Sequence, residues 1–152
     1  MSAGRREEGF TLVGTLLLVA VLGAGVAAYG EIASHAAQRE KEQELLFVGN
    51  QFRQAIGAYY ERSAGQYPLK LEDLLEDKRY PMPQRYLRRL YADPMTGTAQ
   101  WGLIDAPGGG IMGVYSLSGA RPLKSAGFAT RDIAFTGAAR HSDWHFVYNP
   151  AR

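Results

Sequence analysis

Residues 10–29 form a run of twenty residues without a charged side chain, and this run constrains the fold more than any other feature. As a helix it would span about 30 Å, the thickness of the hydrocarbon core of a membrane. Ten of the twenty residues are Leu, Val or Phe, so membrane insertion would gain roughly 3 to 6 kcal/mol, less the penalties of two Thr and three Gly. We therefore predict a transmembrane helix over residues 10–29.

A secretory signal peptide is the alternative interpretation of this segment, because Arg5 and Arg6 precede the apolar run. Cleavage would then fall near Ala27 and Ala28. However, the run is longer than the apolar core of most signal peptides, and it continues directly into a charged helical pattern. The membrane helix is the interpretation that we carry forward.

The sequence predicts that the helix continues beyond the membrane, over residues 30–65. Residues 31–44 contain no proline and alternate in charge, which is typical of a solvated helix; the residues concerned are Glu31, His35, Arg39, Glu40, Lys41, Glu42 and Glu44. Apolar residues then recur every three or four positions, at Leu45, Val48, Phe52, Ile56 and Tyr59. This spacing predicts a helix face that packs on a core, and Gly65 and Pro68 predict where the helix stops.

Residues 66–152 are predicted to form a small globular domain. A linker-like loop over residues 67–94 contains a short helical piece at 69–76, and a turn follows at 93–97. Strand patterns occur at 100–104, 111–117 and 144–148, and residues 118–143 are rich in Gly, Ala and Ser, which is typical of loop. The predicted fold class is therefore α+β, with a long N-terminal helix packed on a small antiparallel sheet.

The composition limits the functions that this chain can have. The net charge of +2 is too small to indicate a nucleic-acid-binding protein by itself. The chain has no cysteine, which excludes disulfides, thiol catalysis and cysteine-based zinc sites. It contains neither a nucleophile elbow nor a phosphate-binding loop, so we expect no enzyme; a membrane-anchored enzyme remains an open alternative.

The start of the apolar run resembles the processing site of type IV pilin-like proteins. A short charged leader is followed by Glu8-Gly9-Phe10-Thr11-Leu12-Val13. Further pieces stand in the order found in pseudopilins similar to the major pseudopilin of type II secretion systems: Tyr67-Pro68, Leu71-Glu72-Asp73-Leu74-Leu75, Tyr86-Leu87-Arg88, Asp93-Pro94-Met95-Thr96-Gly97, Trp101 and Gly113-Val114-Tyr115-Ser116. The fold that the resemblance implies is pilin-like.

The resemblance implies how such a subunit is matured and where it works. A prepilin peptidase would cut after Gly9, and the new amine of Phe10 would be methylated. Residues 1–9 would be the cytoplasmic leader, residues 10–29 a single pass through the bacterial inner membrane, and the remainder periplasmic. The implied partners are the peptidase, other pseudopilins and the inner-membrane platform of the secretion machine, with no nucleic acid expected. The alternative within the same family is a type IV pilus or competence pseudopilin involved in DNA uptake.

Gly14 departs from the family pattern. The family usually carries a Glu five residues into the mature chain, where its carboxylate meets the terminal amine of a neighbouring subunit. A buried ammonium without a carboxylate is costly, so this subunit cannot neutralise a neighbour's amine in that way. We therefore expect a minor or tip-proximal role, whereas the downstream match to the major pseudopilin favours a major subunit.

Three further groups of residues are candidate sites. Major pseudopilins bind calcium between late strands, for which Asp132 and Asp143 are the carboxylates that residues 116–143 offer. His141 and His145 have the spacing of a helical zinc pair, although the aromatic alternation around them favours a strand. Five basic residues interleaved with tyrosines could contact DNA, or could be a solvated loop whose tyrosines pack on the core: Lys78, Arg79, Arg85, Arg88 and Arg89.

Overall fold

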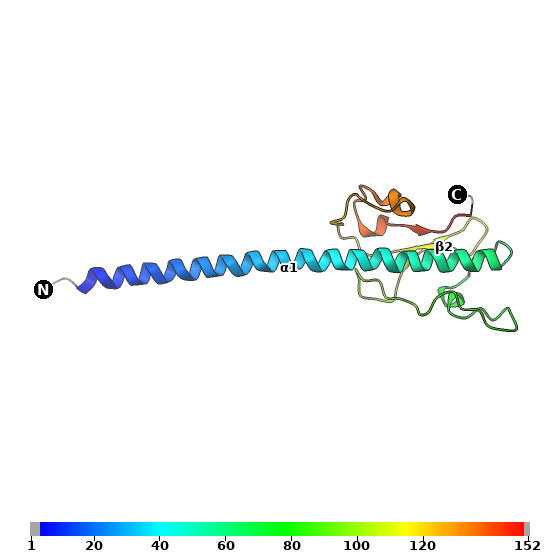
Figure 1. Ribbon diagram of the computed structural model, residues 1–152, viewed down its shortest axis with the longest axis horizontal. Helices are drawn as coiled ribbons and strands as arrows, with labels where there is room; N and C mark the ends of the chain where they lie inside the picture. The colour runs from blue at the N-terminus through cyan, green and yellow to red at the C-terminus, as the bar shows by residue number, and fades with distance from the viewer. Residues whose placement is uncertain (1–3, 151–152) are drawn as a thin grey trace. The chain divides into compact units, whose positions relative to one another are not determined.

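The computed structural model describes the backbone of residues 4–150 and the side chains of residues 12–23 and 33–150. By its internal contacts the chain divides into two compact units, Met1–Gln38 and Arg39–Arg152. The first unit contains only the beginning of helix α1. The second contains the rest of α1 together with all the strands and short helices (Figure 1).

Helix α1 is a single helix over Gly4–Arg62, 59 residues long. The predicted continuation of the helix beyond the apolar run is therefore confirmed. The helix ends where the sequence predicts, because Ala64 and Gly65 adopt positive φ values of 51° and 85°. The backbone N–H of Gly65 donates to the carbonyl of Tyr60 at 3.1 Å and satisfies one of the last helical acceptors.

Among the described residues, no helix has a stretch that is both long and apolar enough to cross a membrane. The segment predicted to do so, residues 10–29, falls partly outside them, because the side chains of residues 10, 11 and 24–29 are not described.

A three-stranded antiparallel sheet forms the second layer, with strand order β1-β2-β3. Its strands are β1 (Gly102–Asp105), β2 (Ile111–Tyr115) and β3 (Phe146–Val147). The register between β1 and β2 shifts between Ile104 and Asp105. Strand β2 lies within its predicted segment, and β1 extends one residue beyond the predicted end at residue 104. The third is shorter than predicted, because a 3-10 turn, η3 (His141–Asp143), precedes it and leaves Trp144 outside the strand.

The core lies between the second half of α1 and this sheet, as Figure 1 shows for α1 and β2. All five residues of the predicted helix stripe are buried: Leu45, Val48, Phe52, Ile56 and Tyr59. Sheet residues of the same core include Val114 and Phe146, both 0% exposed. The α+β prediction, with a helix packed on a small antiparallel sheet, is thus confirmed for this unit.

Short helices connect the main elements. The predicted helical piece after Pro68 is the 3-10 helix η1 (Leu71–Leu74), which buries Leu74 completely and packs Leu71 and Leu75 against the core. The segment predicted as loop contains a second 3-10 helix, η2 (Thr130–Phe135). Within that segment Phe128 and Phe135 are buried against Trp144, so it is an ordered part of the core.

Candidate functional site

Eight of the large apolar side chains that are exposed among the described residues lie close together on the first part of α1. Eight large side chains there are between 58% and 67% exposed: Leu12, Val13, Leu16, Leu17, Leu18, Val19, Val21 and Leu22. At 100° per residue these positions point in all directions around the helix axis. A helix that is apolar on every side is found in lipid or inside a bundle of helices, so this segment needs a covering partner.

The predicted processing site lies at the edge of what the structure describes. Gly9 and Phe10 belong to α1, and their side-chain environment is outside the described residues. Gly14, by contrast, is described and exposed, and a Cβ added there would meet no atom within 4 Å. Packing within the chain therefore leaves room for a glutamate at position 14.

The two carboxylates considered for calcium each have partners within the chain. Asp132 is 4% exposed and accepts hydrogen bonds from Asn50 and Arg53 of α1. Asp143 accepts a hydrogen bond from the backbone N–H of Arg140 at 2.9 Å at the start of η3. Within the described part of the chain, no group of three potential metal-ligating side chains is found.

His141 and His145 have different environments. His141 is 0% exposed, and its Nε2 lies 3.1 Å from Oε1 of Glu42. His145 is exposed and its ring lies 5.3 Å from that of Tyr115. The two histidines therefore lie in different environments, and the buried His141 is beside an acidic side chain.

Glu42 is a buried residue that the sequence did not reveal. The charge alternation predicted a solvated position, but the side chain is 2% exposed, and that prediction is wrong. Its carboxylate accepts the backbone N–H groups of Leu123 and Lys124, at 2.7 and 2.9 Å, in addition to the contact with His141. These donors come from segments more than 80 residues away, and they compensate for the burial of the charge.

The basic segment over residues 78–91 is built around internal contacts of its tyrosines. The hydroxyl of Tyr86 donates to Asp77, and that of Tyr80 donates to the carbonyl of Arg62. The ring of Tyr91 contacts Phe52 edge-on and lies under the guanidinium of Arg89. These contacts match the second interpretation of the cluster, a solvated loop whose tyrosines pack on the domain.

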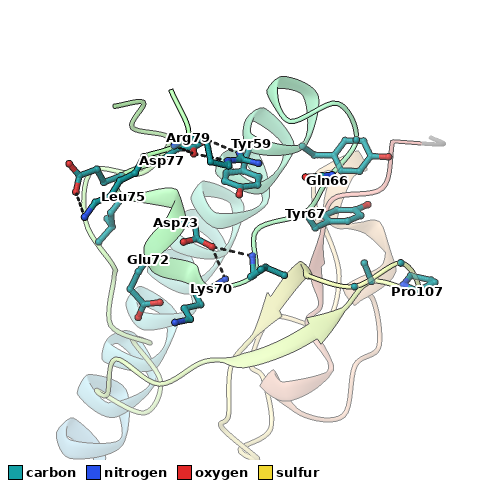
Figure 2. A pocket seen from close by; sticks show the side chains of 18 residues that line it. Tyr59, Gln66, Tyr67, Lys70, Glu72, Asp73, Leu75, Asp77, Arg79 and Pro107 are labelled. Carbon is teal, nitrogen blue, oxygen red and sulfur yellow. Dashed lines mark hydrogen bonds and ion pairs between the residues drawn. The ribbon is translucent and has the colours of Figure 1, made fainter. Parts of the chain in front are cut away.

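A groove of about 1270 Å³ lies where the end of α1, η1 and the β1–β2 turn meet (Figure 2). Figure 2 shows Arg79 and Asp77 joined beside Tyr59, and Asp73 bonded to the backbone near Lys70. Arg79 binds both oxygens of Asp77, with Nε at 2.8 Å and Nη2 at 2.7 Å, and also donates to Ser63 at 2.6 Å. Its guanidinium lies 4.3 Å from the centroid of the Tyr59 ring.

These contacts set the charges of the groove wall. The hydrogen bonds from Arg79 hold the pKa of Asp77 below its usual value, despite burial. Burial raises the pKa values of Tyr59 and Tyr86 above the ordinary value for tyrosine. At neutral pH Arg79 and Asp77 in the wall form an ionised pair, while Tyr59 beside them and Tyr86 behind them are uncharged.

No protein-family model matches the chain, and neither does any curated protein or solved structure.

Proposed function

We propose that this chain is a structural subunit of a type II secretion pseudopilus. In this proposal a prepilin peptidase removes residues 1–9, and residues 10–29 hold the subunit in the inner membrane with the sheet domain in the periplasm. The inner-membrane platform then assembles the subunit with other pseudopilins into a short filament that takes part in protein export.

The exposed apolar band of α1, defined by the eight residues from Leu12 to Leu22, is the observation that carries the proposal. Each side chain is more than half exposed, and together they leave no polar face to the helix. On a membrane-insertion scale these eight residues contribute about 2 to 5 kcal/mol in favour of lipid. A helix bundle of neighbouring subunits would cover the same surface. Lipid would therefore cover the band before assembly, and neighbouring helices would cover it afterwards.

The second half of the helix supports the same proposal. Leu45, Phe52 and Ile56 are completely buried under the sheet domain. These residues belong to the same continuous helix as the apolar band. A force applied to the apolar band during assembly would therefore also move the sheet domain. The domain would then form the filament surface.

A minor or tip-proximal position follows from Gly14. The chain has space for a glutamate there, yet it has none. A subunit without this carboxylate is best tolerated where no further subunit needs its charge, which is the end of a filament.

Gene deletion distinguishes the secretion role from the competence role. We expect deletion to abolish export of secreted proteins while DNA uptake and piliation persist, and the wild-type gene to restore export. A variant with Leu16, Leu17 and Leu18 changed to Ser tests whether export depends on the apolar band. We expect this variant not to restore export. Loss of DNA uptake with normal export would instead assign the chain to a competence pseudopilus.

A further inference from the structure

The η2 segment, residues 129–137, is bonded to α1 through Arg53 and Asn50. Arg53 directs its Nη1 atom at three oxygens: Oδ1 of Asn50 at 2.8 Å, the carbonyl of Arg131 at 3.1 Å and Oδ1 of Asp132 at 2.8 Å. A carboxylate, an amide oxygen and a main-chain carbonyl are the ligand types that calcium prefers in proteins. Here the three oxygens accept hydrogen bonds from the guanidinium of Arg53 instead.

The other oxygen of Asp132 also has partners. Asn50 donates its Nδ2 to Oδ2 of Asp132 at 3.0 Å and to the carbonyl of Leu46 at 2.8 Å. Nε of Arg131 lies 3.6 Å from the same oxygen. Both carboxylate oxygens of Asp132 are therefore engaged by nitrogen donors.

The surroundings of Arg53 keep water away from this ion pair. The side chains of Arg53 and Asp132 are 15% and 5% exposed. The guanidinium lies 5.6 Å from the ring centroid of Phe146 and 5.9 Å from that of Phe135. Aromatic faces attract a cation, and a partly desolvated ion pair is stronger than one in water.

Calcium does not fit these residues. It requires six to eight oxygen ligands, and the second candidate carboxylate, Asp143, is bonded to the backbone at the start of η3. A divalent ion at Asp132 would also meet the charge of Arg53, less than 3 Å from the carboxylate. With Arg53 in place, both carboxylate oxygens of Asp132 already accept hydrogen bonds from nitrogen donors.

We propose that Arg53 is the cation of this site, that it fastens the η2 segment to α1, and that the site takes no calcium. The positive charge belongs to the helix and is always present, because a guanidinium stays protonated at any physiological pH. The η2 segment then stays docked whatever the calcium concentration around the protein.

Thermal unfolding of the full chain in detergent, followed by fluorescence of Trp101 and Trp144, tests the proposal. We expect the wild-type midpoint to be the same in millimolar calcium and in chelator. Arg53→Met should lower the midpoint by roughly 10 °C or more, because it leaves Asp132 buried without its cation. Arg85→Met, at an exposed arginine, is the matched control and should leave the midpoint unchanged.

Two further variants cover the case in which Arg53→Met does not accumulate. Arg53→Lys keeps the charge but loses the planar fork, so its midpoint should lie between those of wild type and Asp132→Asn. The double variant Arg53→Met with Asp132→Asn lacks the unpaired carboxylate, so it should accumulate even if Arg53→Met does not. Where both single variants can be measured, its midpoint should fall by less than the sum of their two changes. The proposal is overturned by a calcium-induced rise of the wild-type midpoint that Asp132→Asn abolishes, or by an Arg53 variant as stable as wild type.

Discussion

The ring of Phe146 in β3 lies directly on Gly49 of α1, in the space that a Cβ at position 49 would occupy. Gly57, two turns further along the helix, meets the ring of Tyr148 in the same way, with a Cβ-to-ring distance of 2.7 Å. Glycine costs helix stability, but here it lets the last strand approach the helix backbone. Two glycines of α1 thus allow the aromatic rings of Phe146 and Tyr148 to pack directly against the helix backbone.

Gly49→Ala should therefore destabilise the sheet domain. Added volume in a packed core costs about 1 to 3 kcal/mol, and a Cβ that would overlap ring carbons of Phe146 places the cost at this site above the helix-propensity gain of about 1 kcal/mol. Denaturant unfolding of the full chain measures this difference. Gly14→Ala is the control, since a Cβ at position 14 meets nothing, and it should not destabilise the domain. Equal stability of Gly49→Ala and wild type would contradict the packing described.

Glu42→Gln should destabilise the domain by about 1 to 3 kcal/mol, because an amide group would direct N–H bonds at the backbone donors of Leu123 or Lys124. Glu44→Gln, two residues away on an exposed position, is the matched control and should have little effect. Hydrogen exchange of the backbone amides of Leu123 and Lys124 measures directly whether their bonds to residue 42 are lost. Protection unchanged in Glu42→Gln would show that the carboxylate does not hold this segment.

Asp77→Asn should make the free energy of unfolding of the domain less dependent on pH in the acidic range. The pKa of Asp77 is lowered in the folded protein, so its contribution is complete above the unfolded value of about 3.9 and is lost as the pH falls through the folded value. At neutral pH the variant should be less stable than wild type, and the difference should shrink below about pH 4. Denaturation midpoints across this range provide the measurement. Asp105→Asn, at an exposed carboxylate, is the matched control.

If the chain has the proposed pseudopilus role, Gly14→Glu should change where the subunit enters the filament without changing how it folds. The exposed position accepts the longer side chain, and the new carboxylate could neutralise a neighbour's amine. Cross-linking to the major pseudopilin should therefore detect the variant along the filament and not only near one end. The same cross-links from wild type and Gly14→Glu would refute the tip-proximal assignment.

The sequence predicted the parts of this fold that depend on short-range patterns. The spacing of Leu45, Val48 and Phe52 identified the buried helix face, and the alternation around Phe146 identified the last strand. The helix stop also followed from local chemistry, because the positive φ at Gly65 favours a residue without Cβ.

The polar contacts could not be predicted, because their partners are far apart in sequence. Glu42 meets His141 across 99 residues, and Arg53 meets Asp132 across 79. In a helix with many charges, the sequence does not distinguish a carboxylate that faces water from one that faces backbone N–H groups. Asp132 was assigned as a possible metal ligand for the same reason, since its arginine partner lies on another element.

The intact mass of the protein extracted from its native membrane tests the central claim most directly. If the apolar N-terminal helix is an assembly element that trimming releases, the mass should correspond to a chain starting at a methylated Phe10, and Gly9→Leu should retain the leader. A working secretion machine whose subunit still carries Met1 would contradict the claim.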